Sequence, residues 1–384
     1  MRDWKAESGK WKADEGWPAK EARSWLAVRR PITFRNPHSA FRIGFTLVEL
    51  LVTMVILAIL GTAILGASRV AMEGARKART KTTITKLHTL LMERYESYQT
   101  RRVNINTAAL TPGQLNNGPF MADVRLLGRR EQMKLEMPDR WSDVLGIGVP
   151  DANPQGVPVQ APVILQTRPS LTSAYLRRYF ALRTNDGSQL TGKLIRLNQG
   201  AECLYMTIML ATGDGEARNL FSQQDIGDTD GDGALEFLDG WGRAISFLRW
   251  PAGFVSDLQP LDTAGNRTPD ADHDPFDPFR RDQQGVFRPN LNSYPNFIKF
   301  HITLIQDRNN DSTNPLSAYR LFPLIYSSGP DGISDIHSNP PYRVMFDPYV
   351  VTPSDEQIGT QVDDASDGQD NFLDNIHNHL MDNK

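Results

Sequence analysis

A predominantly apolar run from Phe45 to Ala67 contains one formal charge, Glu49, and constrains this chain more than any other feature. About 23 residues at a rise of 1.5 Å give roughly 34 Å of helix, which exceeds a hydrocarbon core of about 30 Å. A carboxylate inside such a segment is costly and normally has a specific partner, so Glu49 is a candidate functional residue. The sequence therefore predicts a transmembrane helix over 45–67. The alternative is an ordinary single-pass anchor that contains a chance glutamate.

Residues 1–44, which precede this run, form a long basic leader. They carry ten Lys and Arg residues against five Asp and Glu residues. Because basic residues are retained on the cytoplasmic side of a membrane, we expect the leader in the cytoplasm and the rest of the chain to be exported. An ordinary secretory signal would have a brief basic stretch, a shorter apolar region and a small-residue cleavage site after it.

The exported part is acidic and has a single cysteine. The whole chain carries a net charge of −3, which leaves −8 on residues 45–384 because the leader carries +5. A nucleic-acid partner would call for a basic domain, so no nucleic-acid partner is expected. Cys203 has no second cysteine with which to form an intrachain disulfide. Stability must therefore come from core burial, a metal ion or neighbouring subunits.

A second helical pattern follows the apolar run. Apolar and aromatic residues recur at steps of three and four and share one helical face: Ile84, Leu87, Leu91, Tyr95 and Tyr98. The pattern predicts an amphipathic stalk helix over 68–102 that continues the transmembrane helix and packs against a globular head over 103–384. A coiled coil is the alternative.

The head has separate helical and strand-like stretches. Helices are predicted over 121–137, 171–182 and 201–210, and strands over 244–249, 297–304 and 319–326. The Asp-, Pro- and Arg-rich segment 257–296 is typical of a long surface loop. A long N-terminal helix packed on a small antiparallel β-sheet gives an α+β fold with large loops.

Residues 44–50, Gly-Phe-Thr-Leu-Val-Glu-Leu, resemble the type III signal of prepilins, the precursors of type IV pilins and type II secretion pseudopilins. The resemblance implies cleavage between Gly44 and Phe45 by a prepilin peptidase and N-methylation of Phe45. It also implies that Glu49 pairs with the Phe45 amine of a neighbouring subunit during assembly. The fold implied is that of a pilin.

Two later elements are similar to those of major pseudopilins. Asp239-Gly-Trp-Gly-Arg resembles their Asp-Pro-Trp-Gly-Asn element, with Gly240 where proline is usual. Tyr326-Ser-Ser-Gly-Pro-Asp-Gly332 resembles their C-terminal calcium loop. Here the second acidic cluster of that loop comes late in the chain. The calcium ligands implied by the resemblance are Ser328, Asp331, Asp367, Asp370 and Asp374.

The sequence also contains an EF-hand-type spacing. Asp228, Asp230 and Asp232 occupy positions 1, 3 and 5, a glycine follows at position 6, and Asp239 occupies position 12. Calcium prefers several oxygen ligands in this arrangement. Position 12 is normally a longer glutamate, and the residues after it are typical of a turn and strand rather than a helix. The alternative is a solvated acidic turn.

The resemblance implies a pseudopilin subunit of a type II secretion system, which polymerises into a periplasmic pseudopilus. Its expected partners are other pseudopilin subunits, the prepilin peptidase, the lipid bilayer, and an inner-membrane platform with its ATPase. We expect the chain to be a single-pass inner-membrane protein with its head in the periplasm. Catalytic motifs are absent from the sequence, so we expect no enzyme activity. The alternatives are a minor type IV pilin, or a membrane-tethered binding or enzymatic head that uses a pilin-type export signal.

Overall fold

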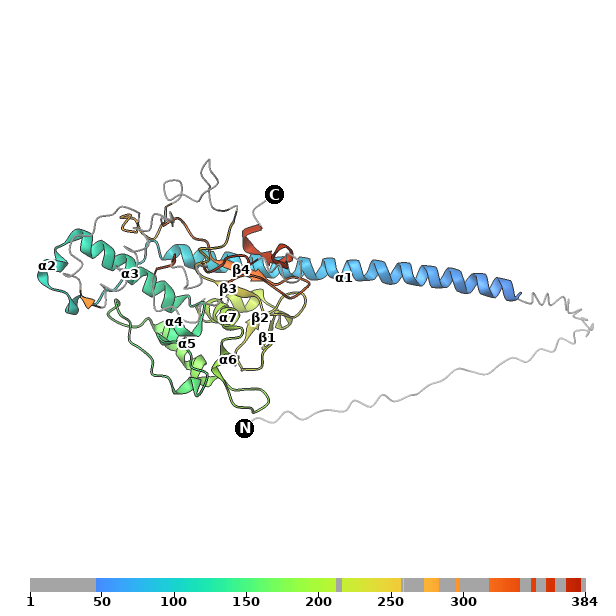
Figure 1. The fold of residues 1–384 in the computed structure, drawn as a ribbon, viewed down its shortest axis with the longest axis horizontal. Helices are drawn as coiled ribbons and strands as arrows, with labels where there is room; N and C mark the ends of the chain where they lie inside the picture. Colours follow the sequence, from blue (N-terminus) through green and yellow to red (C-terminus); the bar gives the residue numbers. More distant parts are fainter. Residues whose placement is uncertain are drawn as a thin grey trace, which may run out of the picture. The chain divides into compact units, whose positions relative to one another are not determined.

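A computed structural model describes most of the chain after the leader. The described residues are 46–211, 216–256, 258, 273–282, 295–296, 318–338, 347–349, 357–362 and 371–380. Helix α1, Leu47–Ser97, is 51 residues long and contains both the predicted transmembrane and stalk segments (Figure 1). It is long and apolar enough to cross a membrane, judged by length and composition. The prediction of one continuous helix is therefore confirmed.

The two halves of α1 differ in burial. Large apolar side chains of its first half are exposed, and Leu47 and Ile64 expose 80% and 65% of their surface. From Thr80 onward one face is buried. The five residues predicted for that face all belong to the main hydrophobic core of the head, namely Ile84, Leu87, Leu91, Tyr95 and Tyr98. The first half of α1 thus presents an uncovered apolar surface, and the second half is a structural element of the head.

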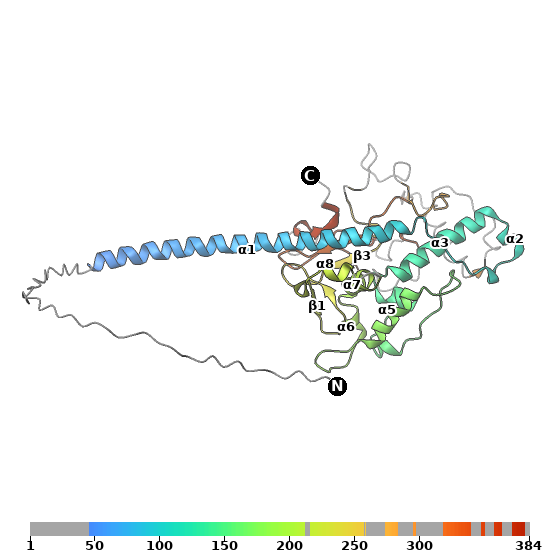
Figure 2. The ribbon, with the colours of Figure 1, turned by 180° about the vertical axis from the view of Figure 1, so that it is seen from behind.

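The sheets of the head are small and antiparallel. Strand β1, Ile226–Gly227, pairs with β2, Glu236–Phe237. Strand β4, Leu324–Ser327, lies between β3, Ser246–Leu248, and β5, Ile376–His377. Strand β3 and helix α7, Gln199–Ala211, lie beside the second half of α1 in Figures 1 and 2. The fold is therefore α+β, as predicted.

The segment between the stalk and the first sheet is helical. Helix α3, Gly118–Glu136, matches the helix predicted over 121–137, and α5, Ser170–Ala181, matches the one over 171–182. Helix α7 covers the third predicted helix. The shorter helices are α2, Pro112–Leu115, α4, Trp141–Leu145, α6, Gly192–Ile195, and α8, Glu216–Leu220.

Three predictions about the C-terminal part of the head need correction or stay open. The strand expected over 319–326 is a strand only from Leu324 onward, and the one expected over 297–304 lies outside the described residues. Part of the predicted surface loop is buried, namely Asp274, Phe276, Asp277 and Asp282, whereas residues 278–280 are exposed as expected. Asp274 and Asp282 are buried there because both form ion pairs with the fully buried Arg130 of α3. The charged composition predicted exposure to solvent, but the buried Arg130 forms ion pairs with both carboxylates.

Gly240 allows the chain to approach α1 closely. A Cβ at this position would lie 2.3 Å from the backbone oxygen of Arg76, which no other residue could tolerate. The Gly240 N–H donates to the Thr80 hydroxyl at 2.8 Å. Proline has no N–H and could not make this bond. The contact requires glycine at this position, and it holds the turn that follows β2 against the stalk.

Candidate functional site

The N-terminal signal is described from Thr46 onward, so the predicted cleavage site between Gly44 and Phe45 lies outside the described residues. Glu49 lies in the first turn of α1 and is exposed. Its carboxylate accepts hydrogen bonds from the N–H and hydroxyl of Thr46 at 3.0 and 3.1 Å, and its own N–H donates to the Thr46 hydroxyl at 3.2 Å. This reciprocal arrangement is a capping box. In the single subunit, Glu49 therefore caps the start of its own helix.

Three predicted loop ligands lie together. Asp228, Asp230 and Asp232 each place one carboxylate oxygen within 4.8 Å of the others. The N–H of Gly233 donates to the Asp228 carboxylate at 3.1 Å, which closes the loop. Gly233 has a φ of +89°, and a Cβ there would lie 2.7 Å from the Arg183 carbonyl oxygen. The glycine at position 6 is thus needed for the loop to fold.

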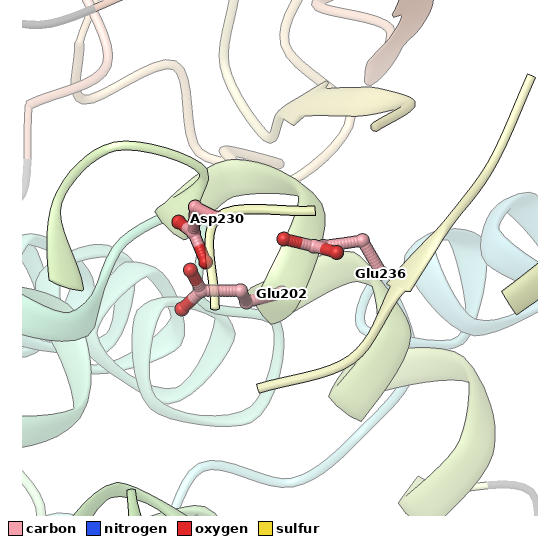
Figure 3. A group of neighbouring side chains, drawn as sticks. All are labelled: Glu202, Asp230 and Glu236. Atoms are coloured by element: carbon pink, nitrogen blue, oxygen red, sulfur yellow. The ribbon is translucent and has the colours of Figure 1, made fainter. Parts of the chain in front are cut away.

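Two glutamates that the sequence analysis did not single out join this loop. Glu202 on α7 and Glu236 on β2 each place a carboxylate oxygen within 4.8 Å of the other and of Asp230. Figure 3 shows the carboxylates of Glu202 and Asp230 facing one another, with that of Glu236 directed toward them from β2. Glu236 is the ninth loop residue, a position that often binds calcium through water. No spacing rule connects Glu202 to the loop. These five residues form an acidic cluster that could bind a metal ion.

Among the described residues, the acidic cluster has no cationic partner in an ion pair. No Lys or Arg of the described residues forms an ion pair with any of its five carboxylates. Three of its buried oxygens have no hydrogen-bond partner: Oε1 of Glu202, Oδ2 of Asp230 and Oδ2 of Asp232. Desolvated carboxylates of like charge are unstable in their ionised form. A hard divalent cation with oxygen ligands fits this donor set.

Burial and mutual repulsion raise the pKa values in the acidic cluster. Desolvation, followed by the charge of Asp232, raises the pKa of Glu202 well above its usual range. Desolvation is also the main cause that raises the pKa of Asp232 to about 7 and that of Glu236 to about 7, with the charge of Asp230 adding to both. The pKa of Asp230 is raised as well, again mainly by desolvation. Ionising this group costs free energy that a bound cation would offset.

In a chelator, the wild-type protein should lose stability relative to Asp232→Asn as the pH rises from about 4 to about 7. The pKa of Asp232 is raised in the folded protein from 3.8 to about 7, so the folded chain holds a proton that the unfolded chain has released. The stabilisation by that proton is fully present below about pH 4 and is lost as the pH rises through about 7. Asparagine cannot ionise and shows no such loss. Melting temperatures across this pH range test the prediction, and equal slopes for the two proteins would contradict it.

Asp239, predicted as the twelfth-position ligand, lies apart from the acidic cluster. Its Oδ1 accepts the N–H groups of Trp241 and Arg243 at 2.8 and 2.9 Å, and its Oδ2 accepts the Ser327 hydroxyl at 2.8 Å. The carboxylate therefore holds the turn after β2 together and joins it to β4. Strand β2, rather than a helix, follows the loop. Asp239 at position 12 therefore bonds to residues outside the loop, and Glu236 and Glu202 lie at the loop instead.

The structure describes only part of the ligand set that the resemblance implies for the C-terminal loop. Ser328, Asp331 and Asp374 are described, whereas Asp367 and Asp370 lie outside the described residues. Burial, followed by the charge of Asp331, raises the pKa of Asp374, and Oδ1 of Asp374 is buried without a hydrogen-bond partner. Asp331 and Asp374 therefore lie close enough to repel one another.

A side-chain cation reaches this C-terminal loop. The Arg243 guanidinium donates to the carbonyl oxygen of Gly329 at 2.6 Å and to that of Pro330 at 3.3 Å. A Cβ on Gly332 would lie 2.6 Å from the centre of the same guanidinium. Arg243 thus occupies backbone oxygens that could otherwise bind a metal ion. Of the two loops, the acidic cluster has the better donor set for a metal ion.

The head also contains a cavity of about 490 Å³ beside the end of α1. Its wall includes four arginines, namely Arg101, Arg102, Arg125 and Arg129. Arg101 already pairs with Glu136 at 2.6 Å. The cavity is therefore basic and polar, and its described lining residues include no aromatic side chain.

Comparison with known proteins identifies the N-terminal segment. Residues 42–65 match the family described as the prokaryotic N-terminal methylation motif. No curated protein and no solved structure matches the chain. The chain is thus pilin-like in its signal, and this motif implies processing by a prepilin peptidase and partners in pilus assembly. Together with the apolar half of α1, it indicates anchoring in the inner membrane.

Proposed function

We propose that this protein is a pseudopilin subunit of a type II secretion system, which polymerises through the first half of α1 into a periplasmic pseudopilus. The observation that carries the proposal is the exposed apolar half of α1 with its single acid, Glu49, on a helix whose other half is part of a folded head. A surface this apolar must be covered by lipid or by other subunits. The methylation motif over 42–65 supports a chain whose apolar surface passes from lipid to contact with other subunits.

Assembly would begin with cleavage between Gly44 and Phe45 and methylation of the new amine. The amine then lies one residue before Thr46, whose N–H and hydroxyl now bind the Glu49 carboxylate. On assembly, Glu49 would bind the Phe45 amine of a neighbouring subunit. A paired charge is tolerated in hydrocarbon, whereas an unpaired one is expelled or neutralised. The pair would offset the cost of burying both charges and would set the axial register of the helices.

The proposed placement is a single-pass inner-membrane protein with the leader in the cytoplasm and the head in the periplasm. Subunits of the same and related kinds, the prepilin peptidase, an inner-membrane platform and its ATPase would be its partners. The role is structural rather than catalytic.

We further propose that the head binds Ca²⁺ at Asp228, Asp230 and Asp232. Calcium takes six to eight oxygen ligands in flexible geometry, which suits an irregular loop rich in carboxylates. In a head whose only cysteine is the buried Cys203, the ion would stabilise a loop that repels itself. Its role would be structural, and loss of the ion would loosen the segment between β1 and β2.

Deleting the gene in its native host distinguishes a secretion pseudopilus from a surface pilus. The proposal predicts that enzymes normally released into the medium accumulate in the periplasm, while surface filaments persist. Complementation with the wild-type chain should restore release, and complementation with a chain carrying Gly44→Asp, which blocks cleavage, should not. Normal release combined with lost surface filaments would favour a minor type IV pilin instead.

A tethered binding head is a second candidate because of the arginine-lined cavity. Three of the arginines in its wall form no ion pair within the described part of the chain, namely Arg102, Arg125 and Arg129. Their charges would favour an anionic ligand. Under this alternative, replacing Arg102 and Arg125 by glutamine would abolish function while leaving filament incorporation intact. The pseudopilin proposal predicts that this double variant still supports secretion.

A further inference from the structure

Glu202 has an environment that the filament role does not explain. It lies on α7 among apolar residues such as Cys203 and Leu204, and it is fully buried. Its Oε2 accepts the indole N–H of Trp141, whereas its Oε1 is buried without a partner. A buried carboxylate with one unpaired oxygen and no cationic partner destabilises a fold unless something else compensates. The unpaired oxygen therefore points to a missing ligand.

The same lack of partners recurs in the loop that faces Glu202. Oδ2 of Asp230 and Oδ2 of Asp232 are also buried and unpaired, although the other oxygen of each accepts a backbone N–H. Each of the three residues thus uses one oxygen for the fold and leaves the other free. Glu202 and Asp230 come within 4.8 Å of each other through their ligand oxygens. Carboxylates from two elements, helix α7 and the loop, therefore meet at Asp230.

We propose that Glu202 is a ligand of the same ion that binds the 228–236 loop, so that bound Ca²⁺ cross-links helix α7 to that loop. The inference rests on the calcium site proposed above and adds a ligand from outside the loop motif. Glu236 belongs to the same group of oxygens as Glu202 and Asp230. Asp228 and Asp232 form a second group of ligand oxygens with the same Asp230. The five carboxylates then serve one calcium centre rather than an isolated EF-hand-type loop.

The space beside Glu202 is large enough for water, although none of the other four carboxylates lines it. A cavity of about 60 Å³ is lined by Glu202, Gly233 and Ala234, among others. This is enough room for ordered water, which needs roughly 10–15 Å³ of such volume per molecule. Water could therefore fill coordination positions that the carboxylates leave open. Magnesium demands a near-ideal octahedron at shorter distances, and soft metals prefer nitrogen or sulfur, so calcium fits this set of oxygens best.

The cross-link would connect the ion to the core of the head. Leu204 and Ile208 of α7 belong to the same hydrophobic core as Ile84 and Leu87 of α1. An ion held by Glu202 therefore fixes the 228–236 loop to a helix that shares its core with the stalk. The Asp239 turn, which contacts Thr80 of α1 through Gly240, follows directly after this loop. Calcium would thus order the side of the head that faces the stalk.

The test uses the full chain in detergent, with terbium as a luminescent calcium substitute and calcium as its competitor. Trp141 donates its indole N–H to Glu202, so excitation of this tryptophan should sensitise a terbium ion bound at Glu202. Trp141→Phe is the matched control that removes the nearby donor while leaving the ligands. Wild type should give luminescence that calcium displaces. Trp141→Phe should lose most of the luminescence but keep calcium affinity in calorimetry.

Glu202→Gln separates this inference from the calcium proposal itself. Glutamine is nearly isosteric and can still accept from Trp141, but it removes one charged ligand. Calcium affinity should fall about tenfold or more because ligand charge tunes these sites. In a chelator, the same variant should melt at a higher temperature than wild type because the cost of burying a carboxyl group without a cation is gone. This opposite sign excludes simple misfolding as the cause of weaker binding.

The other outcomes overturn one proposal or both. If wild type binds calcium and Glu202→Gln binds equally tightly, Glu202 is not a ligand and the loop site alone remains. If Asp230→Asn, which removes the shared ligand, also leaves affinity unchanged, calcium binds elsewhere. If the wild-type chain binds no calcium at all, the calcium site and the cross-link both fail.

Discussion

Replacing Glu49 by leucine is expected to leave membrane insertion and cleavage intact while reducing filament incorporation by about tenfold or more. The apolar half of α1 becomes more apolar, so the span is retained, and the residues at the predicted cleavage site are unchanged. The amine of the neighbouring Phe45 loses its carboxylate and would be buried as an unpaired charge. A buried pair that loses one member is strongly destabilised because the other charge is left uncompensated. Assembly, rather than export, should therefore fail.

Disulfide cross-linking gives a direct measurement of this effect. Cys203 is fully buried, so a cysteine introduced at Leu57, which is 66% exposed, should be the reactive thiol. With the peptidase, platform and ATPase present, oxidation should give disulfide-linked dimers from Leu57→Cys, because each subunit has one reactive thiol. The matched chain that also carries Glu49→Leu should give mostly monomers. Dimers of equal intensity from both chains would contradict the pairing of Glu49 with a neighbour.

Removal of calcium is expected to lower the melting temperature of the full chain in detergent by about 8 °C. A ligand at about a thousand times its dissociation constant adds about 4 kcal/mol, and in a domain of this size each kcal/mol moves the melting temperature by about 2 °C. The physical cause is repulsion among the five carboxylates of the acidic cluster once the ion is gone. Thermal melts with EGTA and with excess calcium measure the shift.

Asp230→Asn is the control for calcium removal because Asp230 belongs to both groups of ligand oxygens. This variant should melt at nearly the same temperature with and without calcium. Asp331→Asn, in the C-terminal loop, should keep the calcium shift of wild type. If wild type melts identically in EGTA and calcium, the acidic cluster has no structural ion. If Asp331→Asn loses the shift and Asp230→Asn keeps it, calcium binds at the C-terminal loop instead.

The helical parts of this fold followed from local patterns. The apolar run and the three- and four-residue periodicity that ends at Tyr98 predicted one continuous helix, although the stalk predicted over 68–102 ends as a helix at Ser97. Such patterns are reliable because a long helix has its buried face encoded at a fixed period. The short strands were harder to predict. Strand β4 has only four residues and lies between two partners that are distant in sequence, so local propensity says little about where pairing begins and ends.

The acidic cluster was predictable only where its residues are close in sequence. Asp228, Asp230 and Asp232 follow from spacing because the loop itself brings alternate side chains together. Glu202 joins them through the packing of α7 against β2, which no local pattern encodes. Asp239 has suitable spacing but bonds to Ser327, since a strand rather than a helix follows the loop. Long-range packing, in each case, decides which carboxylates meet.

The most direct test of the proposed filament role is the N-terminal sequence and intact mass of the membrane-extracted chain, with and without a co-expressed prepilin peptidase. With the peptidase, the account predicts a product that begins at Phe45 and is heavier by one methyl group than the unmodified cleaved chain. Without it, the chain should retain residues 1–44. A chain that keeps its leader in the presence of an active peptidase would contradict the account and reduce the segment to a membrane anchor.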